Sequence, residues 1–239
     1  MSPTALGAVN GPALQEIRGF IFDCDGVLFD SYASNVRYYN AILAHMGLGP
    51  MNRDQEQYIH MHAVKDCLQH ITPPERRGDL EGARRAVNYF TDILPWLEPE
   101  PGLYELLDFL RGHNVPLAIS TNRTTTMEAV SRRFDLYMYF FPIMDAAKVK
   151  AKPSPEGVHR ILEYWGLRPC EAVYIGDSHV DVRTALAAGT PFWAYKNENL
   201  LAAKHVSDYW ALRRELQHIL GPAAARPVRS WPWRAGPLG

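Results

Sequence analysis

The chain has 239 residues and a formal net charge of −1, with 25 Lys and Arg against 26 Asp and Glu. This balance excludes a strongly basic nucleic-acid binder and a strongly acidic solvating protein. Hydrophobic residues make up 47% of the chain, and this content excludes wholesale disorder.

Cysteine usage and apolar patterning predict a cytoplasmic protein. The chain has three cysteines, too few for a disulfide framework. Its longest apolar run, residues 137–144, is far shorter than the roughly 20 residues of a membrane-spanning helix. The N-terminus shows no basic segment followed by an apolar one, so we expect no secretory signal.

The two ends of the chain, residues 1–16 and 221–239, are predicted to be tails. The second holds four prolines and three glycines, which regular helices and central strands do not tolerate. It also holds Trp231 and Trp233, which are unusual in a solvated tail and favour contact with the body of the protein.

Short apolar runs alternate with helical patterns between the tails. The predicted strands are residues 19–23, 115–121, 139–144, 172–177 and 192–195, and each is apolar throughout, as strands buried on both faces are. Helices are predicted at residues 103–112, 125–134, 155–166 and 180–189. This alternation predicts an α/β fold, a Rossmann-like parallel sheet with helices on both faces.

One interval departs from this alternation. Residues 32–98 contain no good strand and are predicted to be helical at 35–46, 64–71 and 76–93. Closely spaced prolines at 95, 99 and 101 then mark a linker back to the sheet. We therefore expect a sheet core formed by 17–31 and 99–220, with an all-helical domain inserted at 32–98.

Polar residues follow the predicted strands at the points where they end. Ligands of parallel α/β sheets bind beyond the carboxyl ends of the strands, so these side chains are expected to meet at one edge. They are Asp23 and Asp25, then Thr121 and Asn122, then Lys152, and finally Asp177 and Asp181.

Clustered carboxylates repel one another, so Asp23, Asp25, Asp177 and Asp181 are expected to share a cation. Oxygen ligands without a usable Cys or His set favour Mg²⁺ over zinc. Such an ion keeps positions open for a phosphate, and Lys152 with Thr121 could hold the other phosphate oxygens. The set predicts a site for phosphoryl transfer.

These residues resemble the motifs of the haloacid dehalogenase (HAD) superfamily. Its DxDG motif matches residues 23–26, its Thr/Ser motif Thr121, its lysine motif Lys152 followed by proline, and its GDxxxD motif residues 176–181. The resemblance covers roughly residues 17–220 and is strongest to the phosphoglycolate phosphatase and β-phosphoglucomutase branch. It implies that the helical insertion is a C1-type cap.

The resemblance also implies a role for each residue. Asp23 would be the nucleophile, forming an aspartyl-phosphate, and Asp25 the general acid and then the base. Mg²⁺ would bind the carboxylates of Asp23 and Asp177 and the main-chain carbonyl of Asp25. Asp181 would orient this metal site, directly or through water. The phosphoryl oxygens would be held by Thr121, the Asn122 amide and Lys152.

Other polar residues near these motifs have less definite interpretations. Arg123 follows the phosphate-binding pair and is a candidate substrate contact, whereas Cys24 is expected to be buried without a chemical role. In the insertion, His60, His62, Lys65 and His70 are candidates for substrate contact or ordinary surface residues. His60 and His62 are two residues apart and do not share a helix face, so they do not predict a metal site.

The expected function is Mg²⁺-dependent hydrolysis of a small phosphorylated metabolite, of the phosphoglycolate or sugar-phosphate type. An acid at position 25 argues against a dehalogenase or a phosphonate hydrolase. A phosphomutase similar to β-phosphoglucomutase and a non-catalytic HAD-like binding module remain alternatives. No nucleic acid or membrane partner is expected, and the protein is expected to be a monomer or a homodimer.

Overall fold

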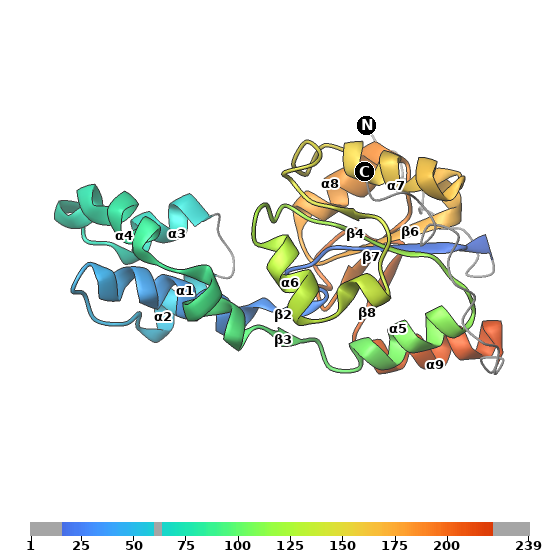
Figure 1. Ribbon diagram of the computed structural model, residues 1–239, viewed down its shortest axis with the longest axis horizontal. Coiled ribbons are helices and arrows are strands. Elements are labelled where there is room, and N and C mark those ends of the chain that lie inside the picture. The colour runs from blue at the N-terminus through green and yellow to red at the C-terminus, as the bar shows by residue number, and fades with distance from the viewer. Residues whose placement is uncertain (1–15, 60–63, 222–239) are drawn as a thin grey trace, which may run out of the picture.

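The computed structural model describes residues 16–59 and 64–221, which form a sheet core and a helical insert lying side by side (Figure 1). Most of the predicted tails, with Trp231 and Trp233, lies outside the described residues, as do His60 and His62. No helix among the described residues has the length and apolarity needed to cross a bilayer.

The core contains a parallel sheet with the strand order β5-β4-β1-β6-β7-β8. Its strands are β1 (Gly19–Phe22), β4 (Leu117–Ser120), β5 (Ile143–Met144), β6 (Ala172–Gly176), β7 (Phe192–Tyr195) and β8 (Lys204–Val206). β1 lies between β4 and β6, and Phe20 is opposite Leu117 on one side and Val173 on the other. The predicted α/β fold is confirmed.

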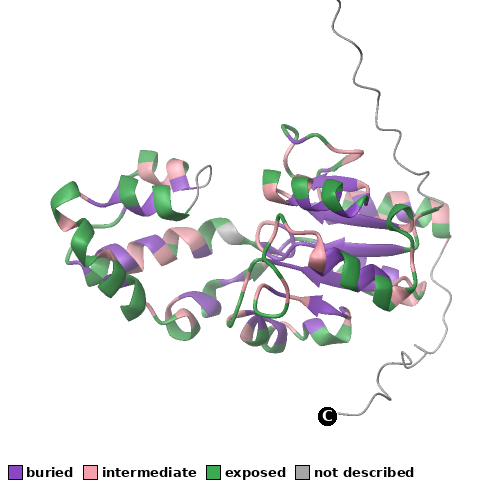
Figure 2. Ribbon diagram, turned by 90° about the horizontal axis from the view of Figure 1, so that it is seen from above, coloured by how far each residue is buried: buried purple, intermediate pink, exposed green. Residues whose placement is uncertain are grey.

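Helices cover both faces of this sheet (Figure 2). On one face α5 (Leu103–Gly112), α6 (Met127–Arg133) and α9 (Tyr209–Leu220) pack on strand residues such as Phe20 and Ile119. On the other, α7 (Glu156–Trp165) and α8 (His179–Ala188) pack on residues such as Ile21 and Tyr174. Because successive strand side chains point to opposite faces, apolar residues throughout a strand serve both layers.

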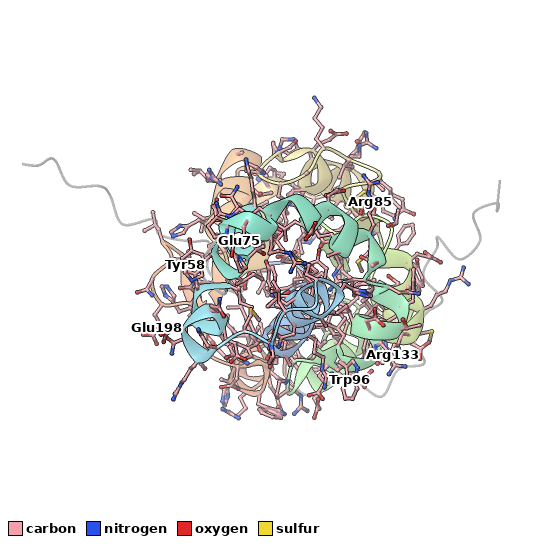
Figure 3. The ribbon with its side chains drawn as sticks, turned by 90° about the vertical axis from the view of Figure 1, so that its left-hand side faces the viewer. Tyr58, Glu75, Arg85, Trp96, Arg133 and Glu198 are labelled. Carbon is pink, nitrogen blue, oxygen red and sulfur yellow. The ribbon has the colours of Figure 1, made fainter. Side chains whose placement is uncertain are left out.

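The insert consists of helices, and its α-helices share an apolar core of their own. The helices of the insert are α1 (Ser31–His45), α2 (Arg53–Ile59), α3 (Val64–Ile71), η2 (Pro74–Asp79), α4 (Leu80–Ala86), η3 (Tyr89–Ile93) and η4 (Leu94–Trp96). Tyr39, Ile42 and Leu68 lie in this separate cluster. In Figure 3, which views the insert from its far end, Glu75 and Arg85 lie on insert segments in front of the core.

Two short antiparallel strands connect the insert to the core. β2 (Phe29–Asp30) precedes α1, and β3 (Glu98–Pro99) follows η4. Asp30 ends β2 and caps α1 by accepting a hydrogen bond from the amide of Tyr32 at 2.8 Å. Beyond β3, the buried carboxylate of Glu100 accepts from the Tyr195 hydroxyl at 3.0 Å and from Lys196 Nζ at 2.5 Å. These contacts hold in place the two segments that connect the insert to the core.

Several predicted elements differ from the structure. The strand expected at 139–144 is confined to β5, because Pro142 has no amide hydrogen to donate to a strand ladder. The helix expected at 76–93 is three segments, with extended backbone at Val87 and Asn88. The elements α2 and α9 and the short strands β2, β3 and β8 were not predicted from the sequence. β8 carries the polar residues Lys204 and His205 on the edge of the sheet, where an apolar pattern is not required.

Replacing Ile119 with alanine tests the packing of the central sheet. The Ile119 side chain is fully buried, so Ile119→Ala is expected to lower the free energy of unfolding by about 2–5 kcal/mol. Leu186→Ala, at a side chain 79% exposed on α8, should change it by less than about 0.5 kcal/mol. Urea denaturation measures both, and equal losses would contradict this account of the core.

Candidate active site

The predicted site residues meet at the carboxyl edge of the sheet. Asp23 follows β1, Thr121 follows β4 and Asp177 follows β6, while Lys152 lies in the loop after β5. A cavity of about 320 Å³ opens here, and its lining is Asp23, Asp25, Thr121, Asn122, Arg123, Lys152, Ser178 and Val180. The insert is attached at this same edge, where β1 ends (Figure 1).

A buried lysine joins two of the carboxylates. Lys152 Nζ lies 2.7 Å from Asp23 Oδ1 and 2.7 Å from Asp181 Oδ1, and its side chain is 6% exposed. Burial alone would lower the pKa of Lys152, but Asp23, Tyr174 and Asp181 outweigh this and raise that pKa well above its usual value. Burial raises the pKa of Asp23 well above its ordinary value, and Lys152 opposes that shift.

Asp181 is surrounded by hydrogen-bond donors. Its Oδ1 accepts from Lys152 and lies 3.2 Å from the Tyr174 hydroxyl, and its Oδ2 accepts from the Ser178 hydroxyl at 2.6 Å and the Ser178 amide at 3.2 Å. A carboxylate offers about four acceptor positions, and the donors of Lys152 and Ser178 occupy three of them. Ser178 and Tyr174 were not predicted as site residues. The spacing of Ser178 and Asp181, a capping box at the start of α8, was the sequence signal for the first of them.

Asp177 lies against a glycine that leaves room for its carboxylate. Gly26 has a φ of +74°, and a Cβ atom there would come within 2.0 Å of Asp177 Oδ2. Burial, together with the charge of Asp181, raises the pKa of Asp177 to about 7. The positive charge near Asp177 is therefore too small to stabilise its buried carboxylate as an anion.

The residues after β4 hold the lysine loop in place. The Asn122 side chain accepts from the Lys152 amide at 2.6 Å and donates to the Lys152 carbonyl at 3.2 Å. The Thr121 hydroxyl accepts from the Arg123 amide at 3.1 Å. The side-chain amide of Asn122 thus positions Lys152, a contact that the sequence analysis did not predict.

Asp25 forms an ion pair that was also not predicted. Arg123 Nη2 donates to Asp25 Oδ1 at 2.5 Å, and Arg123 Nε donates to Asp25 Oδ2 at 2.8 Å. Arg123 is therefore bound to the protein, although the sequence had indicated it as a possible substrate contact. The two residues are 98 positions apart in the sequence, and the fold brings them together at the carboxyl edge of the sheet.

The neighbouring residues behave as ordinary structural groups. Cys24 is fully buried, and burial raises the pKa of its thiol, which disfavours the reactive thiolate. Lys148 Nζ lies 2.6 Å from Asp145 Oδ2 and so pairs with a carboxylate that is not one of the predicted site residues. In the insert, the His70 ring stacks on Tyr58 with centroids 3.8 Å apart.

Comparison with known proteins identifies the family. A sequence model described as haloacid dehalogenase-like hydrolase matches residues 20–195, more than half of the chain. The chain belongs to this family. The hydrolase carries the four motif positions on the strand ends and loops described above, and the predicted resemblance is confirmed.

Its relatives include phosphatases. The phosphoglycolate phosphatase of Rhodobacter capsulatus is 31% identical over 189 residues, which cover 73% of this chain and 82% of that protein. The phosphorylated carbohydrates phosphatase of Thermotoga maritima is 30% identical, with coverage of 71% and 80%. A crystal structure of a HAD-superfamily hydrolase, subfamily IA, variant 1, from Geobacter sulfurreducens has a TM-score of 0.76 and 36% identity, covering 88% of this chain and all of that chain. The prediction of a HAD-type phosphatase is confirmed.

A pair of glycine variants tests the approach of Asp177 to residue 26. Gly26 and Gly47 both have a positive φ, of +74° and +70°, but a Cβ at residue 47 would meet no atom within 4 Å. Either change to alanine should cost about 1–2 kcal/mol of stability because of backbone strain. Only Gly26→Ala would displace the Asp177 carboxylate, so phosphatase activity should fall about 100-fold in that variant alone.

The two measurements are thermal unfolding and phosphate release from a phosphomonoester. Equal activity in Gly26→Ala and Gly47→Ala would show that the space beside Asp177 is not needed for catalysis.

Proposed function

We propose that this hydrolase is a Mg²⁺-dependent phosphatase of small phosphorylated metabolites that works through an aspartyl-phosphate on Asp23. The observation that carries the proposal is the Asp23 carboxylate, placed at the end of β1 on a cavity and paired with the buried Lys152. The names of the relatives favour phosphoglycolate or a phosphorylated sugar as substrate.

The first chemical step is attack by Asp23 on phosphorus. A carboxylate oxygen forms a bond to phosphorus while the bond to the leaving oxygen breaks, and Asp25 donates a proton to that oxygen. In the second step Asp25 takes a proton from water, whose oxygen attacks phosphorus and releases inorganic phosphate from Asp23. Asp25 lies two residues from the nucleophile and lines the same cavity, which supports both of its roles.

The charges at the site fit a divalent cation. Asp23, Asp177 and Asp181 each offer a ligand oxygen, and these atoms lie within 4.8 Å of one another. Their three carboxylates face the single ammonium of Lys152, so two negative charges are left uncompensated. Mg²⁺ bound here would neutralise this excess and stabilise charge that develops on the phosphoryl oxygens.

The carboxylates of Asp23 and Asp177 and the main-chain carbonyl of Asp25 would hold the ion. Asp181 already accepts hydrogen bonds from Lys152 and Ser178, and it would orient the metal site, directly or through water.

The remaining motif residues would bind the phosphoryl group. Lys152, the Thr121 hydroxyl and the main-chain amide of Asn122 would contact its oxygens. Lys152 reaches Asp23 from a loop held by Asn122, so its ammonium is in place before the substrate enters. Charge stabilisation by a preorganised group needs no reorganisation during the reaction.

The division of the chain follows this chemistry. Residues 17–31 and 99–220 would form the catalytic core, and residues 32–98 a C1-type cap that excludes water from the covalent intermediate. The cytoplasmic location, the lack of a nucleic acid or membrane partner, and the monomeric or homodimeric state stay predictions.

Phosphate release from a panel of phosphomonoesters tests the function. With Mg²⁺ the wild type should turn over at least one small metabolite, and chelation should abolish this activity. Asp23→Asn should lower it by at least about 10⁴-fold, because the covalent step loses its nucleophile. Asp54→Asn, which removes an exposed carboxylate from α2, is the matched control and should keep full activity.

The other outcomes contradict the proposal in distinct ways. A stable phosphoryl group on Asp23 after exposure to a sugar bisphosphate, without phosphate release, would indicate a phosphomutase. Neither phosphorylation nor hydrolysis across the panel would indicate a binding module.

Thermal unfolding tests the metal site without measuring turnover. Mg²⁺ at about 100 times its dissociation constant should stabilise the wild type by about 2.7 kcal/mol. Asp177→Asn removes one of the crowded carboxylates and should unfold no earlier than the wild type without Mg²⁺, since like charges repel. It should gain little from added Mg²⁺. Equal stabilisation of both proteins by Mg²⁺ would exclude Asp177 as a ligand.

A further inference from the structure

Arg123 holds both oxygens of the Asp25 carboxylate. Its Nη2 and Nε donate to Oδ1 and Oδ2 at 2.5 and 2.8 Å, in the bidentate geometry that guanidinium and carboxylate groups favour. The Arg123 side chain is 10% exposed, whereas that of Asp25 is 43% exposed. The arginine is therefore the more buried member of the pair, and both residues line the cavity.

The other side of the guanidinium contacts the insert. Arg123 Nη1 donates to the hydroxyl of Tyr89 and lies 3.5 Å from Thr126 Oγ1. Arg123 Cζ also lies 5.4 Å from the centre of the Tyr89 ring. Tyr89 begins η3, one of the last helical segments of the insert, and packs against the main core cluster. A continuous set of contacts thus runs from the insert through Arg123 to Asp25.

This arrangement constrains proton transfer by Asp25. Both oxygens of the Asp25 carboxylate accept from the guanidinium, so both are engaged by Arg123 and neither is free to contact a leaving group. To act as an acid, Asp25 must free one oxygen from Arg123 and keep the other. The guanidinium then sets the direction of the freed oxygen, and Tyr89 and Thr126 set the place of the guanidinium.

We propose that Arg123 is a positioning residue for Asp25, and that Tyr89 makes this positioning depend on the placement of the helical insert. The inference rests on the proposed role of Asp25 in the phosphatase reaction. It assigns Arg123 a function other than phosphate binding, because four of its five N–H donors contact groups of the protein.

The dependence of kcat/KM on the leaving group distinguishes an Arg123 that positions Asp25 from an Arg123 that binds the phosphoryl group. Nitrophenolate leaves from an aryl phosphate without a proton, whereas the alkoxide of an alkyl phosphate needs one from Asp25. kcat/KM reports the steps up to departure of the leaving group, so it excludes the later hydrolysis of the aspartyl-phosphate. The readout is the ratio of kcat/KM for an alkyl phosphate that the wild type hydrolyses to kcat/KM for 4-nitrophenyl phosphate.

Arg123→Gln should lower this ratio about 10- to 100-fold, within the range that general acid catalysis contributes. Tyr89→Phe keeps the ring and removes the hydroxyl, so it should lower the ratio by a smaller factor of about 3 to 10. Arg132→Gln, which removes an exposed arginine of α6 paired with Glu128, should leave the ratio as in the wild type.

A double variant tests whether Arg123 acts through Asp25. Asp25→Asn should lower the ratio at least as far as Arg123→Gln, and adding Arg123→Gln to Asp25→Asn should lower it no further. Thermal unfolding of each variant shows that the protein is folded.

Each of the other outcomes would overturn either the inference or the proposed function. An equal fall for both substrates in Arg123→Gln would mean that Arg123 binds the phosphoryl group, and it would overturn the inference. An unchanged ratio in both Arg123→Gln and Tyr89→Phe would overturn it as well. If the wild type hydrolyses neither substrate, or if Asp23→Asn keeps its activity, the proposed function has failed and not only the inference.

Discussion

The ammonium of Lys152, buried between the carboxylates of Asp23 and Asp181, is the interaction on which the rest of the site depends. It joins the end of β1, the loop after β5 and the first turn of α8. Loss of one member from a buried ionic cluster typically costs about 3–5 kcal/mol, since the other charges stay buried without a partner. The hydrogen bonds between the Asn122 side chain and the main chain of Lys152 therefore matter as much as the ion pairs, because they set where the ammonium lies. Loops after two neighbouring strands together place one charge.

This placement gives chemically similar aspartates different surroundings. Asp181 accepts hydrogen bonds from Lys152 and Ser178, which hold it in place. Asp25 has its own cation in Arg123 and faces the cavity. Asp177 has neither a set of donors like that of Asp181 nor a paired cation like that of Asp25. Its raised pKa reflects a buried carboxylate with too little positive charge nearby. Under the proposed function, neighbouring groups more than residue type would determine which carboxylate binds a metal ion and which transfers a proton. The motif alone specifies residue types, and the packing around each one supplies the difference.

The sequence predicts the strands that lie inside the sheet better than the strands at its edges. β1 and β6 are central, so their residues must be apolar on both faces and the pattern identifies them. β8 lies at the edge and carries Lys204 and His205, so no such pattern is required. At the site, the rule that ligands gather at carboxyl strand ends was enough to bring Lys152 near Asp23. It does not specify side-chain pairs such as Arg123 with Asp25, which depend on rotamers and on the course of two loops.

The insert shows a different limit of sequence reasoning. The polar and apolar pattern of residues 76–93 predicted one helix, but the backbone is extended at Val87 and Asn88. Asn88 then caps the next turn through the amide of Phe90 at 3.0 Å. In an unbroken helix, the position of Tyr89 would be fixed by the register of the turns before it. The break lets the chain place Tyr89 on the core, where it meets Arg123. Local rules are expected to fail where function requires a special geometry, and this helix is interrupted at the residue that connects the insert to the proposed acid.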